Sequence, residues 1–222
     1  MIEYRLIRSD RRTLSISIDR EGALVVRAPK RMSTGEIESF IRQKQRWIEE
    51  KKAAVRKAAD TCPQLAAEAR LPFWGGWLTI AFGAVKKAVC REGILWLPET
   101  GEAAQHARKW RQEQAKALLT PRVEYWAKQT GLQPAKIAFG NAKTRWGSMN
   151  AQTRSLRLNA ALAHCPPALA DYVIVHELVH IIHPDHSPAF HAAVRRFLPD
   201  AESRRSALKG YACLIHLWET AE

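Results

Sequence analysis

The residues best suited to chemistry lie in one short segment, His176-Glu177-Leu178-Val179-His180, which has the spacing HExxH. Residues four apart on an α-helix are separated by one turn and about 40°, so the imidazoles of His176 and His180 project from one face and can bind one metal ion. Glu177 lies about 100° around from His176, which suits a carboxylate that contacts a metal-bound water rather than the metal. The spacing predicts a zinc site with Glu177 as general base.

A third ligand must come from elsewhere, because catalytic zinc usually takes three protein ligands and leaves a fourth position for water. His186 is the first candidate, since Pro184 should end the helix and let the chain turn back over the metal. Imidazole ligands also accept manganese, cobalt and nickel, so Zn²⁺ is inferred from ligand type. Alternatives to His186 stay open at this point: His183, His191, Asp185 and Glu202.

Two other interpretations involve no catalysis. The histidines could be satisfied core residues, or the metal could be purely structural. Structural zinc sites are closed by four ligands, and only three convincing ones are evident here. The motif is also flanked by apolar residues that would bury its helix, and polar side chains on a buried helix need the compensation that a metal supplies. These flanking residues are Tyr172, Val173, Val175, Leu178, Val179, Ile181 and Ile182.

The chain is expected to open with a hairpin followed by a helix. Apolar and polar residues alternate over residues 13–27 around the turn-like Asp19-Arg20-Glu21-Gly22, a pattern typical of paired strands. Ser33, with Glu36 three residues later, resembles a capping box that begins a helix running to about Ala59.

The rest of the chain predicts an α+β protein with a boundary near residue 101. Short strands before that boundary indicate a small antiparallel sheet, and residues 102–129 have helical composition, with Pro121 beginning or kinking a helix. A short sheet and then helices should follow. The strands expected are Trp77 to Phe82, Val85 to Cys90, Ile94 to Leu97, Lys136 to Phe139 and Ser155 to Asn159, with a Trp-Gly-Ser loop before the last and a helix starting at Pro166-Pro167.

Composition bounds the class of protein. With 222 residues, 46% hydrophobic and 26% charged, the chain can bury a core and is not predominantly disordered. The formal net charge of +13 favours polyanionic partners, although a solvated basic helix face explains much of it. No apolar run approaches the roughly 18 residues of a membrane span, and Met1 to Arg5 lack the apolar core of a signal peptide, so we expect a cytoplasmic protein. Four scattered cysteines predict neither disulfides nor a cysteine metal site.

Beyond these local patterns, the sequence resembles the YgjP-like metal-dependent hydrolases, which are grouped with zincin-type metallopeptidases and related to the SprT-like proteases. The resemblance covers the whole chain, and RWGS, HELxH and HSPxF occur in the family's order and spacing. The segments that carry it are Asn141 to Ser148, Leu156 to Asn159, Tyr172 to His180, and His186 to Phe190, together with the N-terminal Arg11-Arg12 and Trp47-Ile48.

The resemblance implies a zincin-like catalytic portion over residues 102–222, after an N-terminal portion over residues 1–101. It places His176, His180 and His186 on zinc, with Glu177 as general base. Met149 departs from the family, in which a cysteine commonly follows RWGS, so no cysteine-dependent role is expected there.

Three function hypotheses follow. The first is a metallopeptidase that hydrolyses a peptide or protein, in which a strand such as Ser155 to Asn159 could pair with an extended substrate. The second is a nucleotide pyrophosphohydrolase in which Arg145, Arg154 and Arg157 bind phosphate. The third is a nucleic-acid-binding protein with a secondary metal site. Arg145, Trp146 and Arg157 are the candidate substrate-binding residues, although Trp146 could equally be a core residue and Arg145 could pair with a buried carboxylate.

Overall fold

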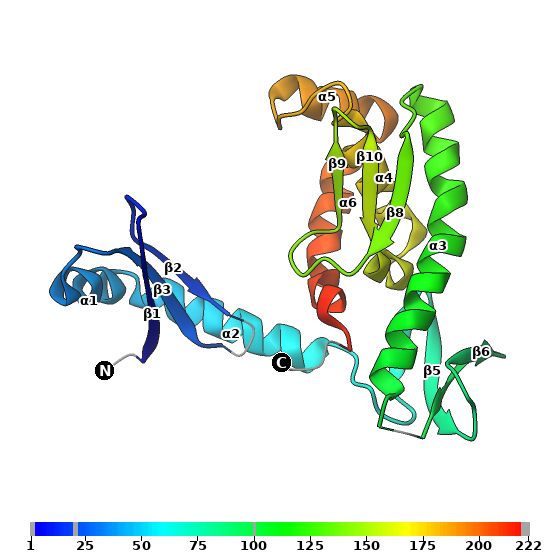
Figure 1. Ribbon diagram of the computed structural model, residues 1–222, viewed down its shortest axis with the longest axis horizontal. Helices are drawn as coiled ribbons and strands as arrows, with labels where there is room; N and C mark the ends of the chain where they lie inside the picture. Colours follow the sequence, from blue (N-terminus) through cyan, green and yellow to red (C-terminus); the bar gives the residue numbers. More distant parts are fainter. Residues whose placement is uncertain (1–2, 20–21, 100, 219–222) are drawn as a thin grey trace. The chain divides into compact units, whose positions relative to one another are not determined.

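The computed structural model describes residues 3–19, 22–99 and 101–218, apart from the side chains of residues 57–61. Helices and three small sheets confirm the α+β class (Figure 1). The chain divides into two compact units, Met1–Cys62 and Pro63–Glu222.

The first unit contains the predicted hairpin. Strand β2 (Ser15–Ile18) pairs antiparallel with β3 (Leu24–Pro29). The expected turn includes residues 20 and 21, which lie outside the described residues. An additional strand, β1 (Tyr4–Ser9), which the sequence pattern did not reveal, pairs parallel with β3.

The capping box is confirmed, but the helix that it begins is interrupted. Ser33 accepts a hydrogen bond from the backbone of Glu36 and the Glu36 carboxylate bonds back to Ser33 at the start of α1 (Thr34–Gln43). The backbone leaves helical geometry at Lys44, so the single helix expected to about Ala59 is two helices, the second being α2 (Gln45–Thr61). The buried side chains Ile37, Ile41 and Ile48 pack against Leu24, Val26 and Ala28 of β3.

The second unit begins with a four-stranded sheet in the order β4-β5-β7-β6. The expected antiparallel sheet is mixed, because β5 and β7 pair parallel. After β5 the chain crosses to the edge as β6 and then returns through a tight turn as β7 beside β5, which leaves these two strands with the same direction. The strands are β4 (Arg70–Phe73), β5 (Gly76–Gly83), β6 (Val89–Arg91) and β7 (Ile94–Pro98).

The boundary expected near residue 101 lies inside this second unit, between β7 and α3 (Ala103–Thr130). The β4 region contacts the residues that follow β10: the Trp74 N–H donates to the Ala163 carbonyl at 2.9 Å, and His164 Nδ1 lies 2.8 Å from the Pro72 carbonyl. The position of a domain boundary near residue 101 stays a prediction.

Helix α3 continues through Pro121 and ends at Gly131, whose φ of 72° is the left-handed conformation that glycine adopts readily at a helix end. A three-stranded sheet follows in the order β8-β10-β9, with β10 parallel to β8 and antiparallel to β9. The Trp-Gly-Ser segment was expected to form a loop, but Gly147 and Ser148 instead belong to an edge strand, which pairing with β10 stabilises. The strands are β8 (Lys136–Gly140), β9 (Gly147–Asn150) and β10 (Ser155–Asn159).

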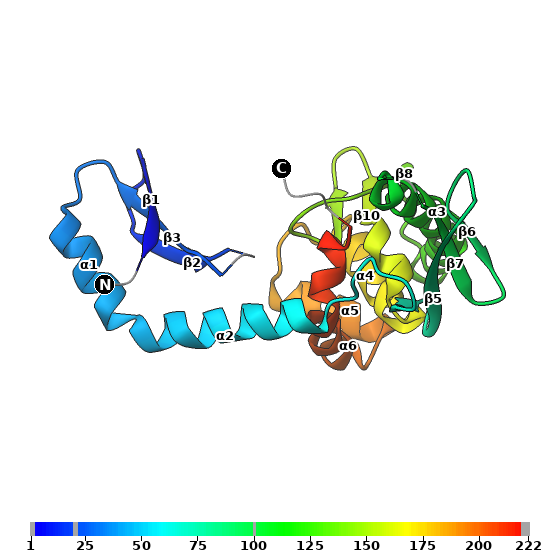
Figure 2. The ribbon, with the colours of Figure 1, turned by 90° about the horizontal axis from the view of Figure 1, so that it is seen from below.

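Helix α4 (Pro167–Val179) lies at the centre of the second unit. It begins at the predicted proline pair and packs against α3, β9, α5 (Pro188–Phe197) and α6 (Ala201–Leu208), as Figures 1 and 2 show. Two 3₁₀ helices, η1 (Ala160–His164) and η2 (Lys209–His216), precede α4 and follow α6. Within the described residues, no helix has both the length and the apolar character that crossing a membrane requires.

The fully buried side chain of Arg111 on α3 holds the C-terminal segment in place. Its guanidinium donates to the carbonyls of Leu214 at 3.3 Å and Leu217 at 3.1 Å, and to Asn141 Oδ1 at 2.8 Å. A buried acceptor that loses its donor lowers the free energy of unfolding by about 1–3 kcal/mol, which exceeds the net contribution of a typical hydrogen bond.

We predict that Arg111→Met lowers the free energy of unfolding by about 3 kcal/mol, because two backbone carbonyls lose their donor. Urea denaturation measures the change. Lys109→Met, an exposed position on the same helix, is the control and should change stability by less than about 0.5 kcal/mol. Equal losses in the two variants would contradict the assigned role.

Candidate metal centre

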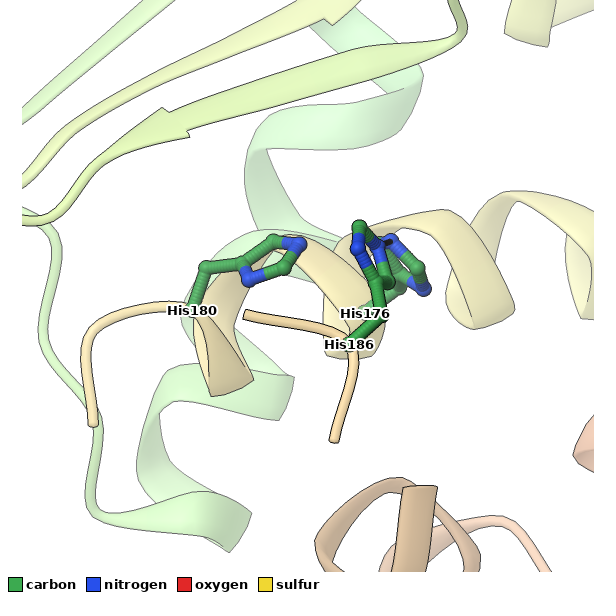
Figure 3. A group of neighbouring side chains, drawn as sticks. All are labelled: His176, His180 and His186. Atoms are coloured by element: carbon green, nitrogen blue, oxygen red, sulfur yellow. Dashed lines mark hydrogen bonds between the residues drawn. The ribbon is translucent and has the colours of Figure 1, made fainter. Parts of the chain in front are cut away.

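Three histidines converge at the C-terminal end of α4. His176 lies in its last turn, His180 is the residue that caps it, and His186 comes from the loop before α5. One ring nitrogen from each lies within 4.8 Å of the others, and Figure 3 shows the three rings grouped together. The Nε2 atoms of His176 and His186 are 3.2 Å apart. The structure therefore brings together the three residues that the sequence singled out as ligands.

The helix ends sooner than expected, and this allows the convergence. Pro184 was expected to end it, but α4 ends at Val179. The N–H groups of His180 and Ile181 bond to the carbonyls of Glu177 and Leu178, a spacing of three residues that tightens the final turn. The tightened turn sends the chain away from the helix axis, and the loop then returns with His186.

None of the four alternative ligands belongs to the three-histidine group. His183 contacts the group through its backbone carbonyl, which lies beside the His180 ring. The ring centroid of His191 is 6.4 Å from that of His186. The carboxylate of Asp185 accepts a hydrogen bond from the Ser187 N–H, and its pKa is lowered by hydrogen bonding first with the side chain and then with the backbone of Ser187. Glu202 pairs with Arg205 at 3.6 Å. The geometry favours His186 as the third member.

The donor set fits a divalent transition metal. His180 Nδ1 lies 2.9 Å from the His183 carbonyl, which places the ring proton on Nδ1 and leaves Nε2 as a free lone pair. Burial, and then the neighbouring histidines, lower the pKa of His176 to about 3, and burial also lowers the pKa of His180. Both rings are therefore neutral at pH 7, as metal ligation requires.

Phe190 forms the floor beneath the histidines. Its fully buried ring stacks on His180 with centroids 4.5 Å apart, and lies 4.8 Å from the His176 ring and 4.9 Å from the His186 ring. Packing against one rigid apolar ring limits the rotamers available to all three imidazoles.

Glu177 is buried against strand β9. The residue is 7% exposed, and burial raises its pKa to about 7, with the Met149 backbone N–H and the charge of Arg145 acting in the opposite direction. A Cβ atom at Gly147 would lie 2.7 Å from Glu177 Cγ and 2.8 Å from Oε1. Only glycine leaves room for the carboxylate in this position. Gly147 thus shapes the site, and no local pattern in the sequence could indicate that contact.

A cavity of about 550 Å³ opens over these residues. Arg145 and Trp146 line it together with the histidines and Glu177, whereas Arg157 lines a second cavity of about 370 Å³ that also includes Arg145 and Trp146. Trp146 is half-buried and packs against the core as well, so it has both of the roles considered for it. Within the described residues, Arg145 forms no ion pair with a carboxylate.

Asn159, which carried no functional expectation of its own, fixes the loop that carries Arg145 and Trp146. It is buried, and its Nδ2 donates to the carbonyls of Ala142 at 2.8 Å and Arg145 at 2.9 Å. Its backbone N–H donates to the Trp146 carbonyl at 2.8 Å. Asn159 can bond to these carbonyls because the loop over residues 141–146 folds back onto the end of its strand.

Comparison with known proteins identifies the class. The model of the YgjP-like family, described as a metallopeptidase domain, matches residues 12–211. A search of curated proteins finds no match. The chain belongs to the YgjP-like metallopeptidase family, and it is a metal-dependent hydrolase.

Two solved structures show a partial likeness. The metallopeptidase zymogen abylysin of Pyrococcus abyssi aligns with 18% identity and a TM-score of 0.38, over 40% of this chain and 90% of abylysin. The zymogen jannalysin of Methanocaldococcus jannaschii aligns with 20% identity and a TM-score of 0.38, over 41% of this chain and 93% of jannalysin. With TM-scores this low, the family assignment rests on the match over residues 12–211.

We predict that the wild-type protein binds one Zn²⁺ per chain and that replacing any of His176, His180 or His186 by alanine lowers the affinity more than about 100-fold, beyond the 10–100-fold typical of a lost outer partner. Competition with a chromophoric chelator and elemental analysis give the affinity and stoichiometry. His183→Ala is the matched control, because it removes an imidazole but keeps the carbonyl that orients His180. Comparable loss in the control would refute the three-histidine assignment.

Proposed function

We propose that the protein is a zinc-dependent metallopeptidase in which His176, His180 and His186 hold the metal and Glu177 is the general base. The observation that carries the proposal is the position of the Glu177 carboxylate, buried in the wall of the same cavity that the three imidazoles line. A purely structural metal has no need of a buried carboxylate beside its ligands. The family match over residues 12–211 supports a peptide or protein as substrate.

The residues of the chain divide the chemistry between them. Zinc, when bound by three neutral imidazoles, supplies Lewis acidity that polarises a carbonyl and makes water more acidic. The Glu177 carboxylate takes the proton of the attacking water and delivers it to the nitrogen of the leaving amine. Burial raises the pKa of Glu177 above the ordinary carboxyl value, and this favours acceptance of a proton by its carboxylate.

The strand expected to pair with substrate was misassigned. Strand β10 (Ser155–Asn159) is central and is already bonded to β8 and β9 on its two sides. Within the described sheet, β9 pairs only with β10, which leaves its outer edge available. An extended peptide added at that edge would lie beside Gly147, whose α-carbon faces Glu177. The nucleotide and nucleic-acid hypotheses gain no support from the family match.

Activity of the zinc-loaded protein tests the proposal. Unfolded protein substrates and nucleoside triphosphates are offered in parallel to the wild type, Glu177→Gln and His180→Ala. We expect peptide-bond cleavage that falls about 10²- to 10⁴-fold in Glu177→Gln, the range typical of a lost general base, while zinc stays bound. Triphosphate hydrolysis that depends on Glu177 would instead select the pyrophosphohydrolase, and no Glu177-dependent turnover would overturn both.

We further predict that Gly147→Ala lowers kcat about 100-fold or more with zinc binding retained. The new methyl group would occupy the space of the Glu177 side chain, and displacement of a catalytic group by about 1 Å has costs of this size. Gly210→Ala is the control, because a Cβ there meets no atom within 4 Å and Gly210 lines neither cavity. A Gly147→Ala variant with wild-type kcat would show that the carboxylate does not act from its observed position.

A further inference from the structure

The second cavity lies on the face of the β8-β10-β9 sheet that is turned away from the core. Leu156 and Leu158 of β10 are buried in the core, so Arg157 between them projects from the opposite face. Arg157 is aligned with Ser148 of β9 and Ala138 of β8, so these three residues share that face. We call it the outer face.

Charge in this cavity is unbalanced. Arg145 and Arg157 are among its lining residues, and no aspartate or glutamate is. Within the described part of the chain, neither guanidinium forms an ion pair. The remaining polar lining comes from Asn141, Ser148 and Asn159. Although the charge of Arg145 also acts on Glu177, two guanidinium groups without an ion pair beside neutral polar groups form an environment suited to a carboxylate.

The two cavities are connected along the chain. Residues 145–148 line both, so a molecule bound in the main cavity adjoins the arginines of the second. Along β9 the side-chain directions alternate: Gly147 and Met149 are aligned with the core-facing Leu158 and Leu156, whereas Ser148 belongs to the outer face. A peptide added to the edge of β9 would have the same alternation.

Arg157 is within reach of such a peptide. The peptide would lie two strand spacings from β10, roughly 10 Å. Ser148, the residue between them on the outer face, is small, so an arginine and a glutamate can extend toward each other above it. Side chains on adjacent strands interact at roughly 5 Å, and here the combined length of the arginine and glutamate side chains must span the strand between them.

From this arrangement we infer that the Arg145–Arg157 cavity is a specificity subsite for an acidic side chain of the substrate. The inference rests on the proposed peptidase function and adds a substrate class to it: peptides with aspartate or glutamate near the cleaved bond, at a position whose side chain points to the outer face. Because the directions alternate, the preference should occur at one position and be absent at its immediate neighbours.

Matched peptides test this inference. A peptide that the zinc-loaded protein cleaves is varied one flanking position at a time with glutamate or glutamine, which differ in charge but hardly in size. We expect the wild type to prefer glutamate at one position by about tenfold in kcat/KM, mostly through KM, as for a charge-assisted contact made in the ground state. Arg157→Glu should reverse the preference, so that lysine is favoured over glutamate there.

The controls distinguish the effect of a charge in the cavity from the effect of a charge elsewhere on the surface. Lys136→Glu changes an exposed residue on the same face that does not line the cavity, and it should keep the preference for glutamate. Arg157 is the better test position, because Arg145 also affects the pKa of Glu177. Equal cleavage of glutamate and glutamine peptides at every position, with cleavage still dependent on Glu177, would overturn the subsite and leave the peptidase standing. Absence of any peptide cleavage would overturn both.

Discussion

Burial of helix α4 is the constraint on which the site depends. Packing on nearly every side stabilises the second unit, but it forces each polar side chain on this helix to find a partner, because an unpaired buried polar group costs several kcal/mol. Asp171 finds Arg122, whose Nε lies 2.8 Å from Oδ1 and whose Nη2 bonds the other oxygen. The Glu177 carboxylate accepts a hydrogen bond from the Met149 N–H, and the His180 ring donates one to the His183 carbonyl. For the three converging imidazoles, a metal ion is the partner that fits.

The wall opposite α4 is held by bonds from distant parts of the chain. Asn159 fixes the carbonyls of Ala142 and Arg145, and Arg111 bonds to Asn141 while it also holds the carbonyls near the C-terminus. These bonds fix the start of β9, and Gly147 is its first residue. The space left for Glu177 is therefore determined by contacts with α3, β10 and the C-terminal segment as well as by α4.

Local patterns were enough to predict some of these features from the sequence. The pairing of His176 with His180 follows from helix periodicity, and the return of His186 requires only a short loop. The capping box at Ser33 and the β2–β3 hairpin are similarly local. Each of these predictions depends on residues that are near neighbours in the chain.

Features set by long-range pairing could not be predicted in the same way. The parallel alignment of β5 with β7 depends on which strand occupies the edge, and periodicity within one strand does not contain that information. Strand β10 shows the same limit. Its sequence pattern predicts a strand but does not indicate its central position in the sheet, which excludes pairing with a substrate. The contact of Gly147 with Glu177 joins residues thirty positions apart, so the requirement for glycine at position 147 becomes evident only from the fold.

An edge strand recognises an extended chain mainly through main-chain hydrogen bonds, which are almost independent of sequence. Selectivity must then come from side chains, and the pleat of β9 sends alternate ones to opposite faces. One face adjoins Glu177 and the histidines, where glycine at position 147 keeps the carboxylate close to the backbone of whatever pairs there. The other adjoins Arg157 across Ser148. In the proposed peptidase, one short strand would therefore position the peptide bond beside Glu177 and the histidines. The next residue of the substrate would direct its side chain toward Arg157.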